Sequence, residues 1–281
     1  MRIDSHQHFW RYDPARDSWI TNAMSALKRD FLPPDLSHEL KRNSIDSCIA
    51  VQTAHSESET QFLLDLAASH NFIAGVVGWV DLCAATLRER LRIFSRFPKL
   101  RGFRHIAQAE PDDRFLIRED FLEGIDALAE FGFTYDILIY PRQLAAAIEL
   151  VAKFPDQRFV LDHMAKPPIR SGKASAREIL WAAQLRQLAS YENVWCKVSG
   201  LITEADWRAW RREDFTPYLD VVFESFGPDR LMFGSDWPVC LLAGSYAQVK
   251  QIVEEYVDAR CPAAKENIFG GTAARFYGLQ E

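Results

Sequence analysis

The stretch Asp4-Ser5-His6-Gln7-His8-Phe9-Trp10, near the start of the chain, decides the fold prediction. In a β-strand, successive side chains alternate between the two faces, so His6 and His8 would share one face at a spacing of about 7 Å. Two imidazoles at that spacing suit one metal ion or one polar substrate, although a pair of ordinary surface or core histidines is the alternative. A second stretch, Phe233-Gly234-Ser235-Asp236-Trp237-Pro238, ends an apolar run at a carboxylate. The fold must bring these two stretches together if they form one site.

Size and composition restrict the class of protein. The 281 residues are 48% hydrophobic, which is enough for a large core, and 33 basic against 39 acidic side chains give a net charge of −6. Because no block of five or more basic residues occurs, nucleic acid and anionic membranes are not expected partners. The five cysteines are widely spaced, as expected of free thiols in a reducing compartment. The first residues lack the apolar core of a signal peptide, and the most apolar run, residues 72–80, is too short to span a bilayer. We therefore expect a cytoplasmic protein.

Short apolar segments alternate with amphipathic, helix-like stretches along the whole chain. We expect eight strands, namely the opening stretch and residues 45–51, 72–80, 100–105, 134–140, 158–163, 194–199 and 231–236. Apolar strands separated by amphipathic helices indicate a parallel sheet covered on both faces. Eight such units without a linker or an internal repeat predict an α/β fold, a (β/α)8 TIM barrel, as a single domain over residues 1–281. A doubly wound open sheet is the alternative, but no glycine-rich phosphate turn follows the first strand.

Polar residues occur where the predicted strands end, and the active site of a (β/α)8 barrel lies at those carboxyl ends. Each of these residues alone would more often be a solvated loop residue, but together they indicate a site. They are His6, His8, Gln52, Arg104, His105, Tyr140, His163, Lys197, Ser199 and Asp236.

The combination of three histidines and one aspartate supports two chemical schemes. Imidazole and carboxylate ligands fit a Zn²⁺ or Mn²⁺ ion with an open position, where bound water has a pKa of about 7. Without a metal, Asp236 would take a proton from water while a histidine or an arginine stabilises the oxyanion. Both schemes describe hydrolysis or addition at a carbonyl carbon. The chain contains no Gly-x-Ser-x-Gly motif, which argues against a covalent acyl-enzyme.

Several motifs, in order and over essentially the whole chain, resemble the amidohydrolase superfamily and, within it, the sugar-lactonase branch. That branch includes fuconolactonases and rhamnonolactonases, and pyrone-dicarboxylate lactonases are more distant relatives. The motifs are the two stretches quoted above, Arg101-Gly102-Phe103-Arg104-His105, Leu161-Asp162-His163-Met164-Ala165-Lys166-Pro167, Cys196-Lys197-Val198-Ser199-Gly200-Leu201 and the tail Asn267-Ile268-Phe269-Gly270-Gly271-Thr272-Ala273.

The resemblance implies a hydrolase of carbohydrate metabolism that opens a sugar lactone, such as fucono- or rhamnonolactone, to the aldonic acid. Asp236 would activate water, and the carbonyl would be surrounded by His6, His8 and His163, as metal ligands or as polarising and proton-donating groups. The implied substrate-binding residues are Arg104, His105, Lys197, Tyr140, Trp10 and Trp237. For the two tryptophans, burial in the core is an equal alternative.

The chain departs from the wider superfamily at the fourth and fifth strands. Arg104 and His105 stand where a metal-bridging lysine or glutamate is expected, and Tyr140 stands where a histidine is expected. The resemblance then implies either no required cofactor or one divalent ion, zinc first, held by His6, His8, His163 and Asp236. Two other hypotheses stay open, a metal-dependent decarboxylase of an aromatic acid and a barrel that binds a sugar acid without turnover. The identity of the lactone and a homo-oligomeric state also stay open.

Overall fold

Eight parallel strands form one sheet, in which each strand pairs with the next one along the chain. The computed structural model describes residues 1–171 and 175–279, so residues 172–174 and 280–281 of the predicted domain lie outside the described residues. The strands are β1 (Ile3–Gln7), β2 (Ser47–Val51), β3 (Ile73–Gly78), β4 (Leu100–His105), β5 (Thr134–Ile137), β6 (Phe159–Leu161), β7 (Val194–Val198) and β8 (Leu231–Phe233).

The sheet closes on itself between β1 and the residues that follow β8. The backbone N–H of His8 donates to the carbonyl oxygen of Trp237 at 2.7 Å, and the N–H of Asp236 donates to the carbonyl oxygen of His6 at 2.8 Å. The predicted (β/α)8 barrel is therefore confirmed, and the open-sheet alternative is wrong. The same two hydrogen bonds join the two stretches of sequence from which the prediction started.

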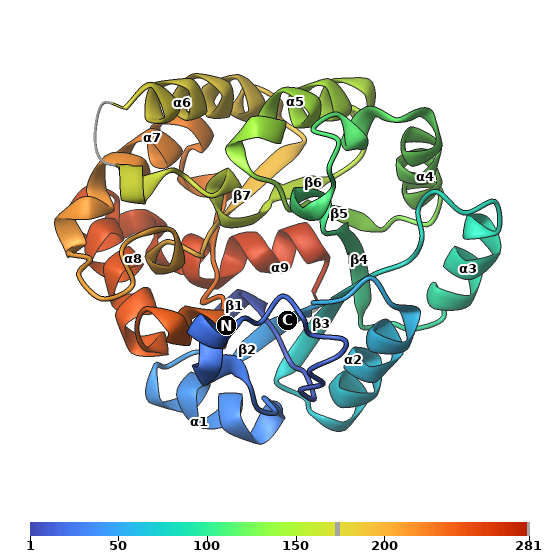
Figure 1. Cartoon of the computed structure of the whole chain (residues 1–281), viewed down its shortest axis with the longest axis horizontal. Coiled ribbons are helices and arrows are strands. Elements are labelled where there is room, and N and C mark those ends of the chain that lie inside the picture. The colour runs from blue at the N-terminus through green and yellow to red at the C-terminus, as the bar shows by residue number, and fades with distance from the viewer. Residues whose placement is uncertain (172–174, 280–281) are drawn as a thin grey trace.

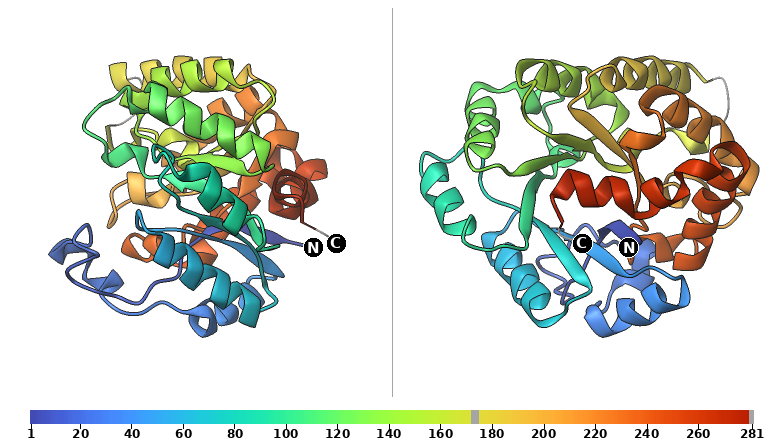
Figure 2. Two further views of the ribbon diagram at one scale, coloured as in Figure 1. Left: turned by 90° about the vertical axis from the view of Figure 1, so that its right-hand side faces the viewer. Right: turned by 180° about the vertical axis from the view of Figure 1, so that it is seen from behind.

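Helices surround the strands, as Figure 1 shows from one end of the barrel and Figure 2 from the side and from behind. They are α1 (Pro33–Arg42), α2 (Glu57–Ser69), α3 (Leu87–Phe94), α4 (Glu119–Glu130), α5 (Leu144–Lys153), α6 (Ala176–Ala189), α7 (Thr216–Phe226), α8 (Tyr246–Arg260) and the short α9 (Thr272–Tyr277). Local sequence sets several of their starts: Pro33 opens α1, and the Ser56 and Ser245 side chains cap α2 and α8. None of the helices in the described part of the chain combines the length and apolar character that crossing a bilayer requires.

The interior of the barrel has an apolar layer and a polar layer. At the end where the strands begin, Phe276 and Tyr277 of α9 pack against side chains such as Ile3, Val160 and Met232. Helix α9 lies across this end, beside the chain termini (Figure 1). Toward the other end, five polar side chains fill the interior, namely His6, Arg104, Asp136, Asp162 and Lys197, all of them buried. The polar layer therefore forms the floor of whatever site opens at the carboxyl ends of the strands.

A β-bulge in β1 sets which residues of the opening stretch face the interior. Asp4 pairs with Cys48 and Gln7 pairs with Ala50, so β1 contains one more residue than β2 between these two pairs. As a result Ile3 joins the apolar layer, Asp4 turns outward to the hydroxyl of Tyr246 on α8, and His6 points inward to Asp162. Strict alternation from Ile3 would have turned His6 outward.

Candidate active site

A cavity of about 420 Å³ opens at the carboxyl ends of the strands, and four of the predicted site residues line it. These four are His8, Arg104, His163 and Asp236. The wall also includes residues that the sequence analysis did not single out, among them Arg16, Asp17, Trp19, His55 and Lys166. His6 is fully buried beneath the cavity.

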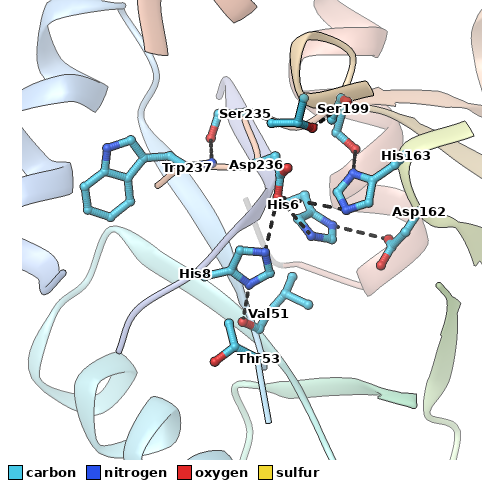
Figure 3. A network of polar contacts seen from close by, with 12 residues as sticks. His6, His8, Val51, Thr53, Asp162, His163, Ser199, Ser235, Asp236 and Trp237 are labelled. Atoms are coloured by element: carbon cyan, nitrogen blue, oxygen red, sulfur yellow. Dashed lines mark hydrogen bonds and ion pairs between the residues drawn. The ribbon is translucent and has the colours of Figure 1, made fainter. Parts of the chain in front are cut away.

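One carboxylate oxygen forms the centre of the site. Oδ1 of Asp236 lies 3.3 Å from Nε2 of His8, 4.0 Å from Nε2 of His6 and 3.9 Å from Nε2 of His163 (Figure 3). Asp236 adopts a left-handed backbone with a φ of 56°, which aspartate tolerates better than most residues. The three imidazoles thus converge on the carboxylate that ends the second stretch.

The far side of each imidazole is held by a different partner. Nδ1 of His8 lies 2.8 Å from the carbonyl oxygen of Val51, and Nδ1 of His163 lies 2.8 Å from Oγ of Ser199. Nδ1 of His6 lies 3.3 Å from Oδ1 of Asp162 (Figure 3). Such outer contacts fix the orientation of each ring and aim its Nε2 atom inward.

Backbone features at the strand ends keep two of these groups in place. Residues 163–166 all have positive φ, between 52° and 56°, so the chain turns sharply as soon as β6 ends. A Cβ atom at Gly200 would lie 2.8 Å from Nδ1 of His163, so that only glycine fits beside the ring. On the other side, Asp4 accepts hydrogen bonds from the N–H of Ser235 at 2.9 Å and from the Tyr246 hydroxyl at 3.0 Å. Asp4 therefore anchors the residue next to Asp236.

The protonation states follow from burial and from the neighbouring groups. Burial lowers the pKa of His163 to about 4 and holds the pKa of His6 well below its ordinary value, so both rings are neutral at pH 7. Burial alone would raise the pKa of Asp236, but attraction to the protonated forms of the neighbouring histidines, His163 first, and a hydrogen bond from His8 outweigh that effect and hold the pKa below its usual range. Asp236 is therefore ionised at pH 7.

An ionic network lies under these groups. Nη1 of Arg104 donates to Oδ2 of Asp162 at 2.9 Å and lies 3.3 Å from Nε2 of His6. Nζ of Lys197 contacts Oδ1 of Asp162 at 3.0 Å, Nδ1 of His6 at 3.2 Å and a carboxylate oxygen of Asp136. Each cation is thus paired with a buried carboxylate, and both touch the same histidine.

The structure places three of the predicted substrate-binding residues away from this cavity. Lys197 is completely buried in the ionic network and does not line the cavity. His105 also stays off the cavity wall, because its Nε2 is bound to Glu110 at 2.7 Å. Tyr140 is 39% exposed and lines a neighbouring groove.

Both predicted tryptophans belong to the core, as the alternative reading of the sequence had it. Trp10 and Trp237 are each 2% exposed, and both pack edge-on against Phe31, with ring centroids at 5.2 and 5.3 Å. The exposed tryptophan at the cavity is Trp19, at 40% exposure. It lies in the irregular segment after β1, where sequence periodicity gives no signal. Asp136 and Asp162, by contrast, carried a readable signal, since a carboxylate inside a short apolar strand needs a buried partner.

The donor set fits one metal ion. Ligand atoms of His6, His163 and Asp236 lie within 4.8 Å of one another, and imidazole with carboxylate is a usual donor set for zinc. A backbone carbonyl only accepts, so Nδ1 of His8 carries a proton toward Val51. Nε2 of the same ring lies 3.3 Å from Oδ1 of Asp236, so a proton or a shared cation between the two atoms would stabilise this contact.

Comparison with known proteins assigns the chain to one family. The amidohydrolase family model matches residues 3–279. The chain is 45% identical to an L-fucono-1,5-lactonase of Burkholderia multivorans, over 100% of this chain and 97% of that protein. It is 37% identical to an L-fucono-1,5-lactonase of Burkholderia ambifaria, over 99% and 96% of the two chains. A crystal structure of a Burkholderia multivorans amidohydrolase with bound zinc has a TM-score of 0.95 and 44% identity, and it covers 100% of both chains. This chain belongs to the amidohydrolase family.

Proposed function

We propose that this protein is a carboxylic ester hydrolase that opens a sugar lactone to the aldonic acid, with L-fucono-1,5-lactone as the first substrate to test. The observation that carries the proposal is the ionised Asp236 at the wall of the cavity, with three imidazoles around one of its oxygens. The full-length identity to two L-fucono-1,5-lactonases supports the choice of substrate. The decarboxylase alternative has less support, because both of these relatives are lactonases.

In the proposed reaction, water attacks the lactone carbonyl carbon while Asp236 accepts its proton. The ring C–O bond then breaks, and the proton held by Asp236 is returned to the departing ring oxygen, so the aldonic acid forms without a covalent enzyme intermediate. The carbonyl oxygen gains negative charge during the attack. Arg104 lies on the cavity wall with Nη1 at 3.3 Å from Nε2 of His6, and in the proposed reaction its guanidinium stabilises that charge.

Because its pKa is low, Asp236 is a weak base and needs help from another group to deprotonate water. A weakly basic carboxylate removes a proton efficiently only when the water is made more acidic or when the developing charge is offset. We propose that a divalent ion, zinc first, is held for this purpose by His6, His8, His163 and Asp236. Such an ion supplies Lewis acidity and brings the pKa of bound water to about 7. The bound zinc in the similar crystal structure supports this choice of metal.

A cytoplasmic location is part of the proposal. All five cysteines are free, at positions 48, 83, 196, 240 and 261, which is the usual state in a reducing compartment. A homo-oligomeric state and the absence of nucleic-acid and membrane partners stay predictions from the sequence.

The first experiment is a pH-indicator assay of acid release from a panel of aldonolactones that includes L-fucono-1,5-lactone. The protein is assayed after chelator treatment and again after addition of Zn²⁺, with Asp236→Asn as the matched inactive variant. Acid release that depends on Asp236 supports lactone hydrolysis, and its dependence on Zn²⁺ separates the two catalytic schemes. If no lactone is opened in either condition, the proposed function is wrong, and aromatic acids become the next substrates to test.

A further inference from the structure

His55 is a polar group of the cavity wall that the proposed mechanism does not use. It follows β2 and lines the same cavity as Asp236. The backbone N–H of Ile106 donates to Nε2 of His55 at 2.9 Å, so Nε2 must be the nitrogen without a proton. In the neutral ring the single proton then resides on Nδ1. Within residues 1–171 and 175–279, Nδ1 has no hydrogen-bond partner, and the residue is only partly exposed to solvent.

A stack of aromatic rings fixes the plane of His55. The ring of His55 stacks on the ring of His105, with centroids 4.1 Å apart. The ring of His105 in turn stacks on that of Phe115, with centroids 4.7 Å apart. The ring of His55 also stacks on Trp79 at 5.6 Å with an interplanar angle of 20°. His105 is itself held between Glu110 and the indole N–H of Trp79. His105 is therefore a positioning residue for His55, which explains why it has no place on the cavity wall.

The ring of His55 is also held in its neutral form. Burial lowers its pKa to about 4, and the neighbouring His105 and Arg104 add to this effect, whereas Glu110 and Asp81 oppose it. The donor on Nδ1 is consequently uncharged throughout the neutral pH range.

The same residues do not form a second metal site, although ligand atoms of His55, His105 and Glu110 lie within 4.8 Å of one another. Nε2 of His55 is occupied by the Ile106 N–H, and both nitrogens of His105 are occupied by Glu110 and Trp79. Two stacked imidazoles also direct their lone pairs in parallel planes and not at a common point.

We propose that the Nδ1–H of His55 is a specificity-determining donor to a hydroxyl oxygen of the sugar lactone, an inference that rests on the proposed function. A lactone is neutral and its product is an anion. An uncharged donor bonds a hydroxyl of either species equally, so it contributes to substrate recognition without holding the charged product more tightly, as a lysine or arginine at this position would.

The test uses two substitutions that separate the two ring nitrogens. In His55→Gln the amide reaches the position of Nε2 and can still accept from Ile106, but no donor remains at Nδ1. In His55→Asn the amide nitrogen takes the place of Nδ1 and can donate. We expect KM for the best lactone to rise about ten-fold in His55→Gln with kcat within about two-fold, and His55→Asn to recover part of the loss. The pH profile keeps its shape, because the ring is neutral. His38→Gln on the exposed face of α1 is the matched control.

A set of deoxy lactones, each lacking a different hydroxyl, identifies which hydroxyl accepts the hydrogen bond from His55. For one deoxy lactone, the wild-type KM should rise by about the same factor that His55→Gln causes with the full substrate. The His55→Gln variant itself should have about the same KM for that deoxy lactone and for the full substrate. An unchanged KM in His55→Gln, or equal losses in both variants together with a lower melting temperature, would overturn the proposal. Binding of the aldonate to Asp236→Asn, with and without His55→Gln, is measured by calorimetry. This readout tests His55 even if the wild type opens no lactone, an outcome that would count against the proposed function alone.

Discussion

Nε2 of His8 lies 3.3 Å from Oδ1 of Asp236, while Nδ1 of the same ring lies 2.8 Å from the carbonyl oxygen of Val51. The backbone carbonyl requires the ring proton on Nδ1, so a neutral His8 presents its other lone pair to a carboxylate. Two acceptors at this distance are stable only with a proton or a metal ion between them. The contact therefore marks the place in the site where one positive charge is needed.

Replacing Asp236 by Asn should lower kcat on the best lactone by about 10²-fold or more, because the amide cannot accept the proton of the attacking water. Steady-state kinetics measure the loss, and a circular dichroism melt checks that the fold is retained. A rate close to that of the wild type would show that another group is the base.

Zinc binding should depend on the outer contact of His163. Ser199→Ala removes the partner of Nδ1, which lies 2.8 Å away, and should weaken zinc affinity about 10- to 100-fold while leaving the ligand itself in place. Competition with a chromogenic chelator gives the dissociation constant without any assay of turnover, and His38→Gln serves as the control. A wild type that takes up no zinc in this measurement would exclude the metal scheme.

Removal of the Arg104 side chain should affect both turnover and stability. If the guanidinium stabilises the oxyanion, as proposed above, Arg104→Ala chiefly lowers kcat, whereas a rise in KM alone would show that it binds a substrate oxygen uniformly. Because Asp162 loses a partner at 2.9 Å in a fully buried position, the free energy of unfolding should also fall by about 3–5 kcal/mol. Urea denaturation at pH 7 measures the second effect independently of the first.

Lys197→Met should destabilise the fold without a specific effect on KM. Lys197 pairs with Asp136 and Asp162, and together with His6 and Arg104 it offsets the burial that would otherwise raise the pKa of Asp162. Removing one partner of a buried ion pair costs about 3–5 kcal/mol, whereas a hydrophobic pair of similar volume can be neutral. Equilibrium unfolding of Lys197→Met and of the double variant Asp136→Leu, Lys197→Met, which keeps Asp162 for Arg104, separates these cases. A rise in KM in a stably folded Lys197→Met protein would restore the substrate-binding role.

Asp4, which anchors the residue next to Asp236, should make the free energy of unfolding depend on pH. Burial raises the pKa of Asp4 from 3.8 to about 6, despite hydrogen bonds from Ser235 that oppose the shift. The folded protein therefore binds this proton more tightly than the unfolded chain, and the stabilisation is complete below about pH 4 and is lost as the pH rises through 6. Relative to Asp4→Asn, the unfolding free energy of the wild type should fall by about 3 kcal/mol between pH 3.5 and 7. A difference between the two proteins that does not vary with pH would contradict the assignment.

The sequence alone was enough to predict the barrel and four residues of the cavity wall. Eight apolar strands with amphipathic helices between them form essentially one closed arrangement, the (β/α)8 barrel. In that barrel the carboxyl ends of all eight strands lie at the same end. The positions of His8, His163, Arg104 and Asp236 on the cavity wall followed from that rule alone. The point at which a strand ends is a local property of the sequence. It shows where apolar residues stop recurring with the period of a strand, two residues, or of a helix, 3.6 residues.

Which side chains reach the cavity depends on packing between distant parts of the chain, so the sequence could not show it. The bulge in β1 turns His6 inward, and the depth of Lys197 below the cavity comes from its pairing with two carboxylates on other strands. The side chains of His55 and Trp19 come from loops, whose paths no periodicity encodes. Trp10 and Trp237 look like ligand platforms in sequence but pack against Phe31. The depth of a side chain along the barrel axis depends on register and on partners distant in the chain, and these exist only in the folded protein.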